Sequence, residues 1–150
     1  MTNVLIATDG SEQSLEAARY MRSIVSAASI KKITVIAVIR PLAAVPFVSD
    51  FGEGHPPGTT HEPVSFRREA QEAVERIATE VRDLDPEVST LVWSGSPAEE
   101  IVRAAREIEA GLIVVSSRGS GVVDTVLMGS VAHRVLHYAH CPVLVVRPTR

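Results

Sequence analysis

The chain has 150 residues, of which 45% are hydrophobic and 22% charged, and its formal net charge is −3 at pH 7. This size and composition fit one globular domain with a single core. The small negative charge gives no general attraction to nucleic acid or to anionic membranes, and no apolar run approaches the roughly 18 residues of a membrane-spanning helix. With one cysteine and a first strand that starts without a signal peptide, we expect a cytoplasmic location.

The first third of the chain predicts two strands that flank one helix. Residues 4–7 form a short unbroken apolar run and residues 33–39 a second, mostly apolar stretch, which are typical of strands covered on both faces. Between them, Ser11 is well placed to cap a helix. That helix would carry its apolar side chains along one side, at Leu15, Ala18, Met21 and Val25.

Residues 41–62 follow the second strand and show no hydrophobic periodicity. The segment is rich in proline and glycine, and a connection of this length in a compact domain is usually functional or mobile. We therefore expect a flexible loop over about 41–62 within a single domain that spans residues 1–150.

The second half of the chain predicts three further helices and three further strands. Apolar residues from Phe66 to Leu84 recur at spacings of three and four and indicate a long helix. Residues 88–93 alternate in the manner of an edge strand. Ser96 to Glu99 fits a capping box with proline at the first helical position, and Gly111 is expected to end that helix. Strands over 112–115 and 143–146 enclose a last helix over 131–138.

Strands and helices thus alternate along the whole chain. This order predicts the α/β class: a single-domain, open, Rossmann-like sheet of five parallel strands with helices on both faces. Right-handed crossovers restrict its topology further.

The stretch from Val114 to Val131 contains the strongest functional signal. A buried strand leads into a glycine-rich loop, in which Gly119 is followed after nine residues by Gly129 and Ser130 at the start of a helix. Backbone N–H groups and the positive end of a helix dipole can hold a phosphate there. The same residues also suit a plain strand-to-helix connection, with Ser130 as N-cap.

This spacing resembles the nucleotide loop of the universal stress protein family, where Gly-x2-Gly-x9-Gly-(Ser/Thr) surrounds the phosphates and ribose of ATP. The resemblance extends to Asp9-Gly10-Ser11, to Gly95-Ser96-Pro97-Ala98 and to the closing residues 141–146, and so covers essentially the whole chain. One position differs, because Ser116 stands where the family has its first glycine. A positive φ at that position would make serine unfavourable by about 1–2 kcal/mol.

The resemblance implies the strand order 3-2-1-4-5, in which strands 1 and 4 are neighbours where the winding reverses. Ligands of open α/β sheets bind beyond such a switch point. It also implies a site for ATP, or for ADP or AMP, together with Mg²⁺, and the site residues carried over are Ala7, Thr8, Asp9, Val38, Ser116, Arg118, Gly119, Gly129, Ser130 and Val131. Three of these have simpler alternatives: Asp9 as a turn residue, Val38 as core and Arg118 as a solvated loop residue.

The other potentially reactive side chains give weaker signals of function. His133 and His137 lie one helical turn apart but lack a third ligand, so we assign no metal site. Cys141 is expected to be a small buried residue. No Walker lysine and no residue committed to activating water is present, so we assign no catalytic residue and expect any ATPase activity to be slow.

Two functions remain open at this stage. The first is a regulatory protein of the universal stress response that binds an adenine nucleotide. The alternative is a nucleotide-independent dimeric interaction module of the same fold, which Ser116 keeps open. In either case the apolar strand 143–146 would lie at a sheet edge, and antiparallel pairing of two copies would cover it. We expect a homodimer, and neither a nucleic-acid nor a membrane partner.

Overall fold

A computed structural model describes residues 1–41, 62–118 and 128–148 of the chain. The loop expected over 41–62 therefore falls almost entirely outside the described residues, and so does Gly119 of the glycine-rich loop. No helix in the described part of the chain is both long and apolar enough to cross a membrane.

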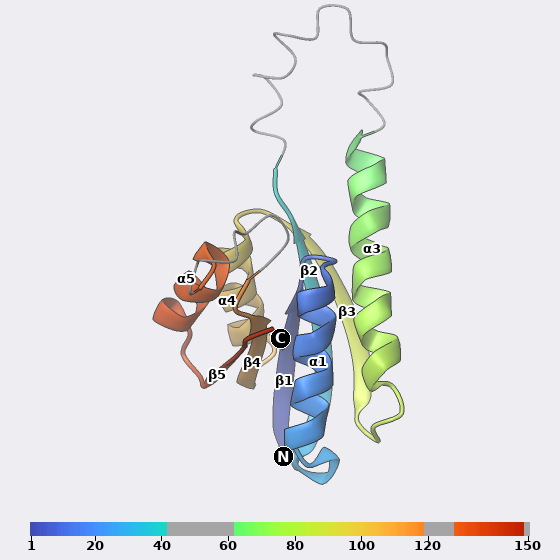
Figure 1. Ribbon diagram of the computed structural model, residues 1–150, viewed down its shortest axis with the longest axis vertical. Coiled ribbons are helices and arrows are strands. Elements are labelled where there is room, and N and C mark those ends of the chain that lie inside the picture. Colours follow the sequence, from blue (N-terminus) through green and yellow to red (C-terminus); the bar gives the residue numbers. More distant parts are fainter. Residues whose placement is uncertain (42–61, 119–127, 149–150) are drawn as a thin grey trace, which may run out of the picture.

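The described residues form the alternating strands and helices that the sequence predicts (Figure 1). The structure also adds a short 3-10 helix, η1, ahead of the second strand. In chain order the elements are β1 (Thr2–Thr8), α1 (Glu12–Ile24), η1 (Ala27–Ser29), β2 (Ile30–Ile39), α3 (Glu62–Val81), β3 (Glu87–Ser94), α4 (Pro97–Glu107), β4 (Ala110–Ser116), α5 (Ser130–Tyr138) and β5 (Val143–Val146).

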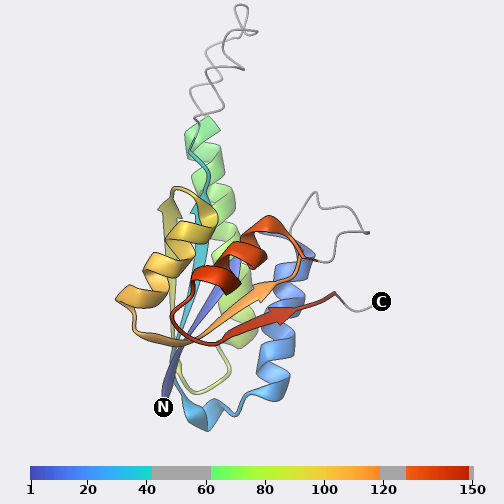
Figure 2. The ribbon, with the colours of Figure 1, turned by 90° about the vertical axis from the view of Figure 1, so that its left-hand side faces the viewer.

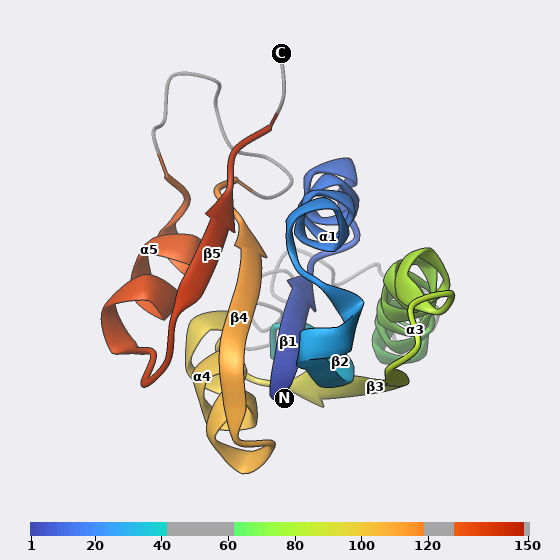
Figure 3. The ribbon, with the colours of Figure 1, turned by 90° about the horizontal axis from the view of Figure 1, so that it is seen from below.

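The strands form one parallel sheet in the order β3-β2-β1-β4-β5. This result confirms the predicted fold class and strand order. Figure 3, which looks along the strands, shows α1 and α3 on one face of the sheet and α4 and α5 on the other. In Figure 2 the last two helices lie beside each other.

Each face of the sheet has its own apolar core because successive strand residues point to opposite faces. On the α1 and α3 face, Ile6 and Val35 pack with Met21 of α1 and Ile77 of α3. On the other face, the strand residues Leu5, Ile36, Ile113 and Val115 pack with α4 and α5. The strands are therefore covered on both sides, as their apolar runs predict.

The helix starts agree only in part with the sequence predictions. Ser11 caps α1 as expected, since its hydroxyl accepts a hydrogen bond from the Ser14 amide at 3.3 Å. Ser96 is the N-cap of α4 and Pro97 is its first residue, but the Ser96 side chain makes no capping hydrogen bond. The predicted capping box is therefore not formed, and the carboxylate of Glu99, its acidic member, pairs with Arg134 of α5 at 3.5 Å.

Gly111 has a different role from the one predicted for it. The helix α4 ends at Glu107, and Glu109 adopts the positive φ of 53° that turns the chain. Gly111 instead lies in β4, where an added Cβ would approach Thr2 Cγ2 to 2.6 Å. The glycine is needed for the close approach of this strand to β1, and it does not end the helix.

Two isoleucines provide a test of the core. Ile33 is fully buried on the α1 and α3 face, whereas Ile24 at the end of α1 is 54% exposed. We expect Ile33→Ala to lower the free energy of unfolding by about 2–5 kcal/mol, because it leaves a cavity. Ile24→Ala should change it by only about 0.5 kcal/mol. Chemical denaturation measures both values, and equal losses would contradict the assignment of the core.

Candidate functional site

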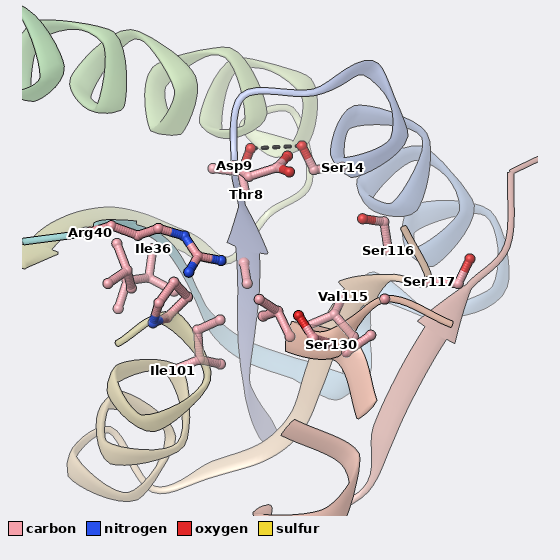
Figure 4. Close-up of a pocket in the computed structure, with 16 residues that line it drawn as sticks. Thr8, Asp9, Ser14, Ile36, Arg40, Ile101, Val115, Ser116, Ser117 and Ser130 are labelled. Atoms are coloured by element: carbon pink, nitrogen blue, oxygen red, sulfur yellow. Dashed lines mark hydrogen bonds between the residues drawn. The ribbon is translucent and has the colours of Figure 1, made fainter. Parts of the chain in front are cut away.

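A pocket of about 260 Å³ lies beyond the carboxyl ends of the central strands. Its walls come from the ends of β1, β2 and β4, from the first turns of α4 and α5, and from Ser14 of α1. Because β1 and β4 are neighbours, this is the switch point of the sheet (Figure 4). Open α/β sheets bind their ligands at this place.

Most of the residues predicted for the site surround this one pocket. Eight of the ten lie in its wall: Ala7, Thr8, Asp9, Val38, Ser116, Gly129, Ser130 and Val131. The chain thus brings together residues from four separate parts of the sequence. Arg118 follows β4 but does not line the pocket, and Gly119 lies outside the described residues.

Asp9 and Gly10 form the turn that closes β1. The Asp9 carboxylate accepts a hydrogen bond from the Ser11 amide at 3.0 Å, and the side chain is exposed at the pocket. Gly10 has a φ of +85°, a conformation that favours glycine. Asp9 therefore fills the structural role of a turn residue, and its exposed carboxylate also faces the site.

The buried hydroxyls of Thr8 and Ser14 hold the same turn in place. Thr8 Oγ1 and Ser14 Oγ lie 2.8 Å apart, as the dashed line in Figure 4 shows. Thr8 Oγ1 also accepts a hydrogen bond from the Gly10 amide, and Ser14 donates to the Ser11 carbonyl. These bonds fix the β1–α1 connection against the pocket wall.

Ser116 occupies its position without backbone strain. It is the last residue of β4, pairs with Val146 of β5, and is not among the residues with positive φ. Its hydroxyl donates a hydrogen bond to the Arg118 carbonyl at 2.7 Å. The backbone here has no requirement for the family glycine, and the serine itself helps to shape the start of the loop.

The first turn of α5 faces the pocket with backbone amides. Gly129 is the N-cap, with φ −70° and ψ 159°, so Ser130 is the first helical residue. The Gly129 amide donates to the Ser117 carbonyl at 2.6 Å and is therefore already used. The next amides, from Ser130 to Ala132, have no acceptor within the helix, and all three residues line the pocket.

Several residues of the pocket were not predicted from the sequence. Ser117, Ile36, Ile101 and Pro97 line it together with Ser14 and Arg40. The apolar residues look like ordinary core positions in the sequence. Arg40 directly follows β2. The alternation of side chains along a strand is the one sequence signal that places Arg40 on the same face as Val38.

The remaining reactive residues lie away from the pocket lining. His133 and His137 are exposed on α5, and no cluster of three potential metal ligands occurs among the residues that the structure describes. Cys141 is half-buried beside the core of the α4 and α5 face, and burial raises the pKa of its thiol. It is a packing residue, as predicted, and a poor nucleophile at neutral pH.

The fold and the pocket define a small Rossmann-like domain with a pocket at the switch point of its sheet. A family model described as the universal stress protein family matches residues 1–147, and the chain belongs to this family. It is 36% identical over 148 residues to the universal stress protein MJ0531 of Methanocaldococcus jannaschii, with 96% of this chain and 81% of that protein covered.

Solved structures show the same fold. The chain superimposes on the protein MJ0577, also from Methanocaldococcus jannaschii, with a TM-score of 0.81 at 25% identity, covering 99% of this chain and 97% of the other. A universal stress protein solved in complex with cyclic AMP gives a TM-score of 0.61 at 23% identity, with coverage of 99% and 98%.

Proposed function

We propose that this protein binds an adenine nucleotide in the pocket beyond β1 and β4 and acts as a regulatory member of its family. The observation that carries the proposal is that eight of the ten residues implied by the family resemblance line one pocket. The complex of a related protein with cyclic AMP supports the adenine class of ligand.

The first turn of α5 would hold the phosphates. Ser130, Val131 and Ala132 line the pocket, their amides have no acceptor within the helix, and the positive end of the helix dipole adds to their attraction for an anion. No acidic side chain lies in this turn to oppose the phosphate. The Ser130 hydroxyl supplies one further donor.

The base and the ribose would lie across the ends of β1 and β2. Ile36, Val38 and Ile101 form an apolar wall for the base, and burial of apolar surface favours binding of a planar ring. Asp9 directly follows β1, the strand between β2 and β4 in the sheet, and its exposed carboxylate lines the pocket. It can accept hydrogen bonds from the ribose hydroxyls.

Magnesium would enter with the nucleotide. Mg²⁺ is usually held by one or two carboxylates together with the substrate phosphates, and Asp9 is the carboxylate that lines the described pocket. Among the described residues that line the pocket, none is a histidine, lysine or glutamate placed to activate water. Hydrolysis should therefore be slow, and the bound nucleotide would act as a signal that changes conformation or partner choice.

Equilibrium dialysis of the purified protein against ATP, ADP, AMP and cyclic AMP, each with Mg²⁺, tests this function. We expect saturable binding of at least ATP with one site per chain. If none of the four nucleotides binds at millimolar concentration, the proposal fails.

Ser116→Gly tests whether the departure from the family pattern weakens the site. Because the backbone of Ser116 is extended and unstrained, replacing the serine with glycine relieves no backbone strain. It removes the hydrogen bond to the Arg118 carbonyl and makes the start of the loop more flexible. We expect ATP affinity to stay the same or to fall by up to about fivefold, the value of one hydrogen bond. Stronger binding by the glycine variant in calorimetry would show that Ser116 hinders the ligand.

A dimeric interaction module remains the second candidate function, and one observation favours dimerisation. The strand β5 pairs only with β4 in the described sheet, and its residues Val143, Leu144 and Val145 are only half-buried. An exposed apolar edge strand promotes association. We propose that two copies pair through β5, whether or not nucleotide is bound.

A further inference from the structure

Arg40 lies on the β2 side of the pocket wall. It directly follows β2, and strand alternation places it on the same face as Ile36 and Val38. Both of these residues belong to the α4 and α5 face of the sheet. Figure 4 shows the Arg40 guanidinium extending into the pocket on the side of Ile36 and Ile101.

The Arg40 side chain has its donors available, in contrast to several other arginines of the chain. Arg22, Arg76 and Arg103 each pair with a carboxylate on the surface. Arg40 is exposed, and it forms no hydrogen bond or ion pair within the described ranges of the chain. Among the described residues that line the pocket it is also the one lysine or arginine. The guanidinium is therefore free to contact a ligand.

The position of Arg40 relative to the phosphates determines which part of the ligand it would meet. This step rests on the proposed function. The strand β2 is two places from β4 in the sheet, which corresponds to roughly 10 Å at the usual strand spacing. With the phosphates at α5 and the base on Ile36 and Val38, we place the edge of the purine remote from the ribose toward Arg40, which lines the same side of the pocket. That edge carries the substituent at position 6.

The chemistry of a guanidinium at this edge is selective. Arginine has five N–H donors and no acceptor, and it pairs well with two acceptors such as O6 and N7 of guanine. The 6-amino group of adenine is a donor, so it would face the guanidinium without forming a hydrogen bond. A 6-oxopurine, as in inosine or guanosine nucleotides, instead offers an acceptor at the same place.

We propose that Arg40 is a specificity-determining residue that reads position 6 of the purine and extends the ligand range of this site to 6-oxopurine nucleotides. The site binds adenine nucleotides through its apolar wall and its phosphate donors. Arg40 reduces the advantage of adenine and raises the relative affinity for ITP and GTP.

The test compares ATP with ITP, because these two nucleotides carry an amino group and a carbonyl oxygen, respectively, at position 6. Binding of both is measured by calorimetry for the wild type and for Arg40→Gln, whose amide has both a donor and an acceptor. Arg106→Gln is the matched control, since Arg106 is exposed in the last turn of α4 and does not line the pocket. It removes the same charge.

We expect the ratio of ITP affinity to ATP affinity to fall about tenfold in Arg40→Gln, which lies within the usual range for one bidentate base contact. The ratio should not change in Arg106→Gln. A wild type that binds ATP while Arg40→Gln keeps the same ratio would overturn the inference and leave the proposed function standing. An equal loss of affinity for ATP and ITP would overturn the inference too, because it would show that Arg40 acts through general charge attraction. If the wild type binds neither nucleotide, the proposed function itself fails.

Discussion

Gly129→Val is expected to abolish ATP binding while the fold remains intact. Gly129 is the N-cap of α5 and lines the pocket where the phosphates would approach the first-turn amides. A branched side chain there would block that approach. Its φ of −70° and ψ of 159° are in the extended region that valine adopts readily, so the backbone has no conformational reason to change. Calorimetry measures the affinity, and circular dichroism measures the fold.

Ser130→Ala is the matched control for this prediction. It alters the adjacent residue but removes only one hydroxyl and leaves the amides and the helix dipole in place. We expect a loss of about 1 kcal/mol, or roughly fivefold in affinity. A folded Gly129→Val protein that binds ATP as tightly as the wild type would show that the phosphates lie elsewhere.

Leu144→Lys is expected to convert a homodimer into a monomer or an aggregate. Leu144 lies in the edge strand β5 and is only half-buried in the single chain. In a dimer that pairs through this strand, the lysine ammonium would be buried at the interface, and an unpaired buried charge is strongly unfavourable. Analytical ultracentrifugation at micromolar concentration gives the oligomeric state.

The same leucine-to-lysine change at Leu136 provides the control. Leu136 is 48% exposed on α5, away from the backbone edge of β5, so we expect Leu136→Lys to remain dimeric. Circular dichroism shows whether either variant is unfolded. A wild-type protein that sediments as a monomer would refute dimerisation through β5 without any variant.

The arrangement of the strands could be predicted because the signals for it are strong and repeated. The apolar run at 4–7 and the mostly apolar stretch at 33–39 correspond to strands covered on both faces. The strand order came from the family resemblance. The sequence could not show the structural role of individual small residues such as glycine. Gly111 looks like a helix terminator, but a close contact with Thr2 requires it, and such a contact depends on which strands become neighbours.

The site was predicted incompletely for a similar reason. Residues in the family pattern, such as Asp9 and Gly129, could be transferred by position. Arg40 belongs to no motif, and it lines the candidate pocket only because β2 carries it to the same place as the first turn of α5. Ser116 was left open, since strain there depends on a backbone angle that the sequence does not reveal, and the structure gives it no positive φ.

The most direct test of the account is a titration of isotope-labelled protein with ATP and Mg²⁺, followed by NMR of the backbone amides. The proposed site predicts saturable shifts that are largest for residues of the pocket wall, namely Thr8, Asp9, Val38, Ser130 and Val131. Shifts confined to other surfaces, or no shifts at millimolar ATP, would contradict nucleotide binding at the switch point of this sheet.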